Sequence, residues 1–120
     1  MKKLKLYLLT SVMLSALLVS CEEETVYDET FLYGKWKSGT EYYRYFNDGT
    51  GYTWDTSDDV TEEEAQDFTW TLEASDLTQI HIIEMGGTVP KYYTVTELTS
   101  TTLKYKDDFG KSFSFSKVSD

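Results

Sequence analysis

Hydrophobic and polar side chains alternate along most of the chain after residue 31, which is typical of strands with one buried face. Phe68, Trp70 and Leu72 fall on one side of such a strand, and the polar residues between them fall on the other. The same alternation separates Phe113 and Phe115 from the serines around them. We therefore predict eight strands, at residues 32–37, 41–46, 50–54, 68–73, 78–84, 89–98, 102–107 and 111–118.

Short turns join most of these strands, so their order along the chain predicts an up-and-down antiparallel meander. The clearest turn is Asn47-Asp48-Gly49, in which Gly49 supplies the left-handed residue of a three-residue hairpin loop. Gly86-Gly87 and Asp108-Phe109-Gly110 offer the same freedom later. A meander with one apolar face leaves two exposed edges unless it closes, so we expect a small all-β, eight-stranded antiparallel barrel.

One connection is longer than the others and joins the third and fourth predicted strands. Within it, Thr61-Glu62-Glu63-Glu64 has the spacing of a capping box, and Val60 and Ala65 are placed for a hydrophobic staple. We expect one short helix here, covering one mouth of the barrel. It must dock against the barrel, because an isolated helix of this length does not persist in water.

The first 20 residues have a different pattern, with lysines at positions 2, 3 and 5 followed by an apolar run from Leu6 to Leu18. This is the arrangement of a secretory signal peptide, and the run is shorter than the about 20 apolar residues of a membrane span. Leu18-Val19-Ser20-Cys21 resembles the lipobox of bacterial lipoproteins. The resemblance implies cleavage before Cys21 and lipidation of its sulfur; an ordinary cleaved signal followed by an unrelated cysteine is the alternative.

The segment after the lipobox is acidic and poor in apolar side chains, which indicates a disordered tether. Glu22, Glu23 and Glu24 resemble the surface-export signal of lipoproteins in the Bacteroidota. This resemblance implies a protein anchored in the outer membrane and facing the cell surface; a periplasmic face is the alternative. We therefore divide the chain into a signal peptide at 1–20, a tether at 21–30 and a barrel domain at 31–120.

Charge and cysteine content restrict the partners and the source of stability. Without the signal peptide the chain holds eight basic and 21 acidic residues, a net charge of −13. Such a charge repels phosphate backbones and anionic headgroups, so we expect no nucleic-acid partner and membrane contact through the lipid alone. Cys21 is the only cysteine, so no internal disulfide forms and the domain depends on its core.

Gly34-Lys35-Trp36, at the start of the first strand, resembles the Gly-x-Trp signature of lipocalins. With the eight-strand meander and the lipobox, the chain is similar to small lipocalin-like lipoproteins of the Bacteroidota. This resemblance implies that Gly34 and Trp36 form the barrel floor, with a basic residue of the last strand packed over the tryptophan. No arginine lies near the end, so Lys111 or Lys117 would take that place. The domain is shorter than a full lipocalin, so a large lipid cavity is not implied.

Residues with catalytic or metal-binding chemistry are sparse. His81 is the only histidine, so no histidine cluster for zinc exists, and its place in a strand indicates an exposed or hydrogen-bonded structural residue. The acidic run from Asp55 to Asp67 departs from an EF-hand loop, because Val60 and Gln66 replace the required glycine and glutamate. No spacing selects a catalytic carboxylate pair or an activated nucleophile. We expect no enzyme activity, no metal and no cofactor.

Aromatic residues make up 16% of the chain, and they suggest both a core and a binding surface. An apolar or ring-shaped ligand is the binding hypothesis, and filling of the barrel interior is the alternative. The candidate ligand-binding residues are Tyr43, Tyr45, Trp54, Trp70, Tyr93 and Tyr105. Two functions follow: a lipid-anchored binding module for a small hydrophobic or glycan ligand, or a non-enzymatic interaction subunit of an outer-membrane protein complex.

Overall fold

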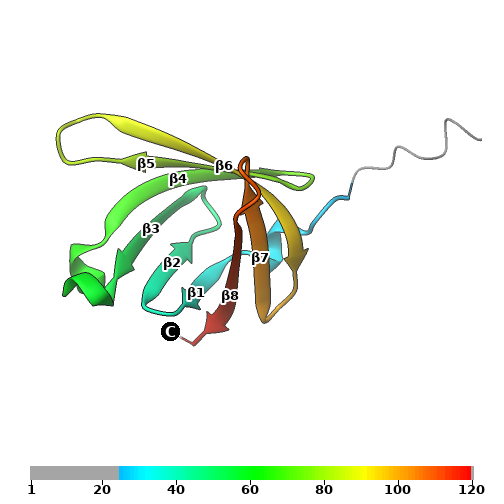
Figure 1. The fold of residues 1–120 in the computed structure, drawn as a ribbon, viewed down its shortest axis with the longest axis horizontal. Helices are drawn as coiled ribbons and strands as arrows, with labels where there is room; N and C mark the ends of the chain where they lie inside the picture. The colour runs from blue at the N-terminus through cyan, green and yellow to red at the C-terminus, as the bar shows by residue number, and fades with distance from the viewer. Residues whose placement is uncertain (1–24, 120) are drawn as a thin grey trace, which may run out of the picture.

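Eight antiparallel strands form a closed barrel in the computed structural model, which describes residues 25–119 (Figure 1). Each strand pairs with its neighbours in sequence, and the ring closes where β1 pairs with β8. The strands are β1 Gly34–Ser38, β2 Glu41–Tyr45, β3 Thr50–Asp55, β4 Gln66–Glu73, β5 Asp76–Ile82, β6 Thr88–Leu98, β7 Thr102–Asp107 and β8 Ser112–Val118. Every strand lies within two residues of its predicted bounds, so the predicted all-β, eight-stranded up-and-down barrel is confirmed.

Alternate side chains of each strand point into the barrel and form one core. The predicted inward residues Phe68 and Trp70 of β4 and Phe115 of β8 are buried, and so are Leu103 and Tyr105 of β7. The interior of a small eight-stranded barrel is just wide enough for side chains to fill it. Rings from neighbouring strands therefore meet, as the Tyr105 and Phe115 rings do with centroids 5.3 Å apart.

The two ends of the barrel differ, and we call them the closed end and the mouth. The 3-10 turn η1 (Glu29–Phe31) and the buried Leu32 lie at the closed end, together with the β2–β3, β4–β5 and β6–β7 turns. The mouth is surrounded by the β1–β2 and β7–β8 turns, the β3–β4 connection and the tip of the β5–β6 hairpin. In Figure 1 the N-terminal segment enters on the right, and the connection and the hairpin tip lie on the left.

The β3–β4 connection contains two 3-10 turns, η2 (Thr56–Asp58) and η3 (Glu62–Glu64), where one short helix was expected. The predicted capping box is present at η3: the Thr61 backbone N–H donates to the Glu64 carboxylate at 3.4 Å. Each turn is three residues long, so the connection contains no regular α-helix.

Polar contacts hold η3 against the outside of the barrel. The Glu62 carboxylate accepts hydrogen bonds from Lys35 Nζ at 3.0 Å and from the Tyr52 hydroxyl at 2.7 Å. Lys35 and Tyr52 belong to the outer faces of β1 and β3, since the inward residue Trp36 follows the first and Thr53 follows the second. The connection therefore packs beside the mouth rather than across it.

The β5–β6 hairpin projects beyond the rest of the barrel at the mouth (Figure 1). Thr88 to Tyr92 of β6 pair with β5 alone, Tyr93 and Thr94 pair with both β5 and β7, and the residues after Thr94 pair with β7. The outer face of this hairpin carries exposed apolar side chains, among them Ile80 and Ile82. The projection thus presents apolar surface away from the core.

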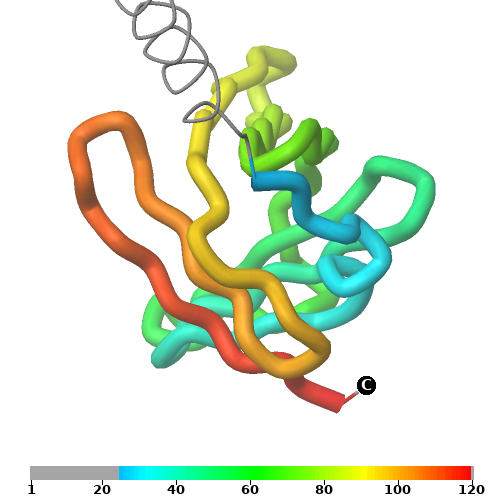
Figure 2. Tube along the Cα trace, turned by 90° about the vertical axis from the view of Figure 1, so that its right-hand side faces the viewer, coloured from blue at the N-terminus to red at the C-terminus, as the bar shows by residue number. Residues whose placement is uncertain are grey.

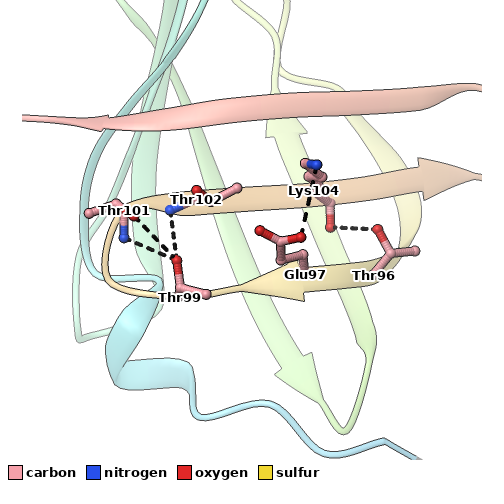
Figure 3. A network of polar contacts seen from close by, with 6 residues as sticks. All are labelled: Thr96, Glu97, Thr99, Thr101, Thr102 and Lys104. Carbon is pink, nitrogen blue, oxygen red and sulfur yellow. Dashed lines mark hydrogen bonds and ion pairs between the residues drawn. The ribbon is translucent and has the colours of Figure 1, made fainter.

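Threonine side chains stabilise the β6–β7 turn at the closed end (Figure 3). Thr99 Oγ1 accepts hydrogen bonds from the backbone N–H groups of Thr101 at 3.2 Å and Thr102 at 3.0 Å. Beside the turn, Thr96 Oγ1 donates to the Lys104 carbonyl oxygen at 3.3 Å. The threonine hydroxyl thus supplies a partner to amides at the tip of the hairpin, as hydroxyl side chains often do in turns.

The chain contacts the barrel further upstream than expected. The Tyr27 backbone N–H donates to the Ala74 carbonyl oxygen of the β4–β5 turn at 3.3 Å, and the Tyr27 ring packs against the core. Figure 2 shows the trace of this N-terminal segment, in blue, lying beside the barrel. Asp28 accepts a hydrogen bond from the Thr30 backbone N–H at 3.0 Å and caps η1. The prediction of a disordered tether is therefore wrong for residues 27–30, because the aromatic ring of Tyr27 docks on the barrel.

The predicted signal peptide at residues 1–20, the lipidation site Cys21 and the acidic residues Glu22 to Glu24 lie outside the described residues. Between residues 25 and 119, no helix is both long and apolar enough to cross a membrane. The anchor and its compartment stay predictions from the sequence.

Candidate functional site

The closed end is built around Trp36. Its indole N–H donates to the Leu32 carbonyl oxygen at 2.9 Å, and its side chain is fully buried. Lys117 Nζ, from β8, lies 4.4 Å from the centre of the Trp36 ring and donates hydrogen bonds to the carbonyl oxygens of Phe31 and Tyr33. This lysine therefore occupies the position over the tryptophan and ties the N-terminal segment to the last strand.

Gly34 has both a conformational and a steric reason to be glycine. Its φ of +123° is one that other residues rarely adopt, and a Cβ atom here would lie 3.0 Å from Lys117 Nζ. Lys111, the other candidate for the position over Trp36, instead lies 5.2 Å from the Phe113 ring near the mouth. The Gly-x-Trp motif thus leaves the room that Lys117 needs.

Aromatic rings fill the interior next to the closed end. The Tyr45 ring lies 5.4 Å from the Phe68 ring and 5.7 Å from the Trp70 ring, centroid to centroid. The Tyr105 ring lies 4.4 Å from the Tyr93 ring. Ring pairs at such separations contribute about 1 kcal/mol each beyond the area that they bury. This part of the barrel is a packed core.

Two polar side chains lie inside the barrel on β5. Gln79 is fully buried, and His81 is 3% exposed. Gln79 Nε2 donates to the Tyr45 hydroxyl at 2.7 Å, and Gln79 Oε1 lies 2.8 Å from His81 Nε2. Because an amide oxygen only accepts, His81 Nε2 carries the hydrogen in this arrangement. His81 Nδ1 is then an acceptor, and it has no hydrogen-bond partner among residues 25–119.

His81 is uncharged at neutral pH. Burial lowers the pKa of its imidazole to about 4, and the positive charge of Lys91 on the neighbouring strand acts in the same direction. Of the two expected roles for His81, exposed or hydrogen-bonded, the exposed one is wrong, because the ring is buried; the ring is hydrogen-bonded through Nε2 and not through Nδ1. The register of β5 is the reason: Ile80 and Ile82 face outward, so His81 faces inward.

A pocket of about 350 Å³ opens at the mouth, with His81 among its lining residues. Glu41 and Asp55 enter it from the paired ends of β2 and β3, and Glu64 enters it from η3. Lys91 also lines the pocket, from β6, the strand that pairs with β5. The volume lies at the lower end of the range for small-molecule sites, about 300 to 1,000 Å³.

Carboxylates outnumber cationic side chains in the lining. Three carboxylates, Glu41, Asp55 and Glu64, border the pocket that His81 also lines. Hydrogen bonds from the Ser57 hydroxyl at 2.7 Å and the Ser57 backbone N–H at 2.9 Å lower the pKa of Asp55. Asp55 is therefore ionised at neutral pH, and the site offers hydrogen-bond donors and cations a favourable environment.

The six predicted ligand-binding aromatics do not form one surface. Tyr43 lines the mouth pocket, and burial raises the pKa of its phenol to about 12, so the ring stays neutral. Tyr45, Trp70 and Tyr105 belong to the packed core, and Tyr93 is partly buried against it. For these four residues the alternative of core filling describes their place better than a ligand surface does.

Trp54 differs from the other five because β3 turns it outward. It pairs with Tyr42 of β2, and their rings stack with centroids 4.7 Å apart and planes 3° from parallel. Lys35 Nζ lies 5.6 Å from the Trp54 ring on the same outer face. Trp54 also borders the mouth pocket, where β3 and β4 separate. It is therefore placed at the rim, outside the barrel interior.

Gln79 and the acceptor nitrogen of His81 were missed by sequence reasoning. A signal was present, because Leu77, Gln79 and His81 follow one another at a spacing of two and so share one face. The apolar Ile80 and Ile82 on the opposite face made that face the better candidate for burial. Within residues 25–119, no group of three or more His, Cys, Asp or Glu side chains lies close enough together to hold a metal ion.

Comparison with known proteins adds one further observation on the fold. A family model described as Lipocalin-like domain matches residues 18–105, a range that contains β1 to β6 and most of β7. Searches of curated proteins and of solved structures gave no match.

Proposed function

The chain belongs to the lipocalin-like domain family, and on this premise we propose that it is a lipid-anchored binding module with a small-molecule site at the barrel mouth. The observation that supports the site is a pocket bordered by a buried imidazole, His81, with one unpaired nitrogen. Buried polar atoms nearly always have a hydrogen-bond partner. A bound ligand would supply that partner.

The pocket suits a small ligand with polar groups. Its volume of about 350 Å³ is too small for a long acyl chain, and the interior beyond it is the packed core around Tyr45 and Trp70. Its lining mixes the aromatic Tyr43 with carboxylates and the threonine Thr53. Of the hydrophobic and glycan ligands that we considered, a ring with polar substituents fits this lining better than a lipid does.

Tryptophan emission tests this function. Trp54 borders the pocket, so titration of the purified protein with panels of oligosaccharides and small ring compounds is expected to shift or quench its emission. Trp54→Phe should abolish the response, since Trp36 and Trp70 lie in the core. A flat emission with every class of ligand, in a protein that unfolds cooperatively, would contradict a binding module.

In this proposal Cys21 carries the anchor, after cleavage of a signal peptide at residues 1–20. The support is the position of the chain's one cysteine, directly after Leu18-Val19-Ser20. Mass spectrometry of protein from its host should find acyl chains on residue 21, and Cys21→Ser should move the protein from the membrane to the soluble fraction. An unmodified Cys21 thiol in native material would contradict lipidation.

We place the anchor in the outer membrane of a bacterium of the Bacteroidota type, with the domain on the cell surface. Glu22, Glu23 and Glu24 support this location through their resemblance to a surface-export signal. Protease added to intact cells should degrade the domain, and replacing the three glutamates by alanine should protect it. Full protection of the unaltered protein would favour the periplasmic face.

The protein acts by binding in this proposal, without catalysis, cofactor or nucleic-acid partner. General-base catalysis by histidine needs a nucleophile in contact with the ring. The paired nitrogen of His81 contacts the Gln79 amide instead of a hydroxyl or thiol group. The excess of acidic over basic residues supports the exclusion of nucleic acid.

A second candidate function is an interaction subunit of an outer-membrane protein complex. The observation that favours it is the projecting β5–β6 hairpin, where Ile82 is 45% exposed and Met85, at the tip, is 94% exposed. A photo-crosslinking amino acid at position 85 should capture a partner in intact cells if this function holds. The same group at Thr71, on the exposed side of β4, provides the control. Recovery of uncrosslinked monomer alone would remove this candidate.

A further inference from the structure

We propose that the mouth pocket binds a small organic cation, specifically an ammonium group carried on a flat ring. This inference rests on the proposed function and specifies the class of its ligand. It combines three features of the pocket: the hydrogen-bond role of His81, the charges of the lining and the aromatic face of Tyr43.

The first step is the role of the unpaired nitrogen. The Tyr45 hydroxyl accepts from the Gln79 amide nitrogen, so the Gln79 oxygen faces His81 and its Nε2 must be the donor. His81 Nδ1 is left with a lone pair and no partner among residues 25–119. A ligand that completes this buried chain of hydrogen bonds must therefore be a donor, such as an N–H or O–H group.

The second step separates a charged donor from a neutral one. Glu41, Asp55 and Glu64 border the pocket, and Lys91 is the cation that borders it with them. An anionic ligand would meet three carboxylates, whereas an ammonium ion gains from each of them. Opposite charges attract each other in water, and they attract more strongly where water is excluded. The lining thus favours a cation over a neutral alcohol of the same shape.

The third step concerns the ring. Two aromatic side chains line the pocket: Tyr43, which is 8% exposed and remains neutral, and Trp54. Flat rings pack against aromatic side chains, and a cation within about 6 Å of an aromatic ring is attracted to the face of that ring. A ring bearing an ammonium group can place its flat part on Tyr43 and its N–H groups towards His81 and the carboxylates.

Three probes of one shape test the inference: benzylamine, benzyl alcohol and benzoate. They share a benzyl or phenyl ring and differ in charge, being a cation, a neutral donor and an anion at neutral pH. We expect nuclear magnetic resonance titration of the purified protein to show the strongest binding for benzylamine, with shifted amides at Tyr43, Thr53 and His81. The His81 imidazole nitrogens should show an unprotonated Nδ1 whose resonance moves on addition of benzylamine.

A matched pair of variants separates local charge from net charge. Glu41→Gln removes one carboxylate from the pocket, and it should weaken benzylamine binding about fivefold, the change that corresponds to about 1 kcal/mol. Benzyl alcohol binding should weaken less, because the alcohol carries no charge. Glu73→Gln makes the same charge change at the closed end. It should leave the affinities for benzylamine and benzyl alcohol unaltered, since Glu73 is the last residue of β4 and lies away from the mouth.

The outcomes distinguish this inference from the function beneath it. Stronger binding of benzyl alcohol or benzoate at the same residues would overturn the preference for a cation and leave the binding module standing. A hydrogen found on His81 Nδ1 would overturn it as well. If none of the three probes shifts a pocket residue, while an oligosaccharide changes Trp54 emission, the cation is wrong and the binding function holds; silence from every ligand contradicts both.

Discussion

His81 is a basic side chain in a place that disfavours its charged form. Its ring lies 5.1 Å from the Phe68 ring inside the barrel, and burial together with the nearby Lys91 lowers its pKa to about 4. In an unfolded chain the same imidazole titrates at about 6.5. Folding in mildly acidic solution therefore requires His81 to release a proton, which links the stability of the barrel to pH.

We expect the free energy of unfolding to decrease by about 3 kcal/mol as the pH falls from about 6.5 to about 4. Across this window the unfolded chain binds the His81 proton and the folded chain does not, so acid favours unfolding. Below it both states are protonated, and His81 contributes no further loss. Urea unfolding at several pH values measures the effect. His81→Phe should flatten the profile, and an unchanged slope in that variant would assign the effect to other groups.

Gly51 illustrates how one missing side chain determines a strand's orientation. A Cβ atom at this position would lie 2.3 Å from the Arg44 carbonyl oxygen and 2.7 Å from Cζ of the Phe68 ring. Both distances are far shorter than van der Waals contact. Only glycine therefore allows β3 to approach β2 and the Phe68 ring this closely.

Gly51→Ala should lower the free energy of unfolding by about 3 kcal/mol, because the added methyl group overpacks the core and displaces backbone. Gly39→Ala is the matched control: its φ is +60°, and nothing lies within 4 Å of the added Cβ atom. That variant should lose about 1 kcal/mol from backbone strain alone. Chemical denaturation of both variants gives the comparison, and equal losses would mean that the crowding at Gly51 relaxes at no cost.

The pairing of β1 with β8 is the element contact that closes the barrel, and it is short. Its register joins Lys35 to Val118, Trp36 to Lys117 and Lys37 to Ser116. Lys117 strengthens this contact, because its ammonium group donates hydrogen bonds to the carbonyl oxygens of Phe31 and Tyr33, which precede β1. The same group lies over the Trp36 ring. One side chain thus joins the first strand, the last strand and the N-terminal segment.

Replacing this lysine should open the seam. Lys117→Met removes the hydrogen bonds to Phe31 and Tyr33, and we expect a loss of about 2 kcal/mol, typical of bonds to a charged group. Lys117→Arg keeps a cation over Trp36 and should lose less. Hydrogen exchange of the β1 and β8 amides, with denaturation as a measure of total stability, tests this. Equal destabilisation by Met and Arg would argue against a specific role of the ammonium group.

The molecule as a whole is acidic, with 21 acidic and 11 basic residues and a net charge of −10. Ion pairs such as Lys35–Glu62 at 3.0 Å balance some of this charge on the barrel surface. The remaining carboxylates repel one another in the compact state, which destabilises it through self-repulsion. The strength of that repulsion depends on the salt concentration.

Salt should therefore stabilise the protein. We expect the free energy of unfolding to rise by about 1 kcal/mol between about 0.01 M and about 1 M sodium chloride, as the screening length shortens from about 30 Å to about 3 Å. Thermal unfolding across this range measures the trend. Glu73 faces Asp76 across the β4–β5 turn, so Glu73→Lys should weaken the dependence of stability on salt. A fall in stability with salt would show that attractive pairs dominate.

Much of the architecture is predictable because the alternation is strong where each strand buries one face. Phe68 and Trp70, or Phe113 and Phe115, define their strands without any other information. Turn chemistry is equally local, and Gly49 takes the left-handed φ of +84° that the hairpin loop requires. Contacts between distant segments are not local, and Lys117 was one of two candidates until the register of β8 was known.

The site was harder to predict, because the inward face of a strand is chosen by its neighbours. In β3 the large rings Tyr52 and Trp54 invite burial, yet Gly51 must face Phe68, and this puts Thr53 inside and Trp54 outside. In β5 the pairing of Phe68 with His81 has the same effect and buries a polar residue. Which alternate residues of a strand face inward depends on close contacts across the barrel, and no single stretch of sequence contains these contacts.

The route by which the chain joins the barrel determines which way the pocket opens once the protein is anchored. Tyr27 is bonded to Ala74 at the end opposite the mouth, and it follows Cys21 by six residues. A chain of that length reaches at most about 20 Å. A bilayer that held acyl chains on Cys21 would therefore lie beneath the floor of the barrel. The opening would point outward into the aqueous medium, where dissolved molecules arrive by diffusion without passing through lipid headgroups.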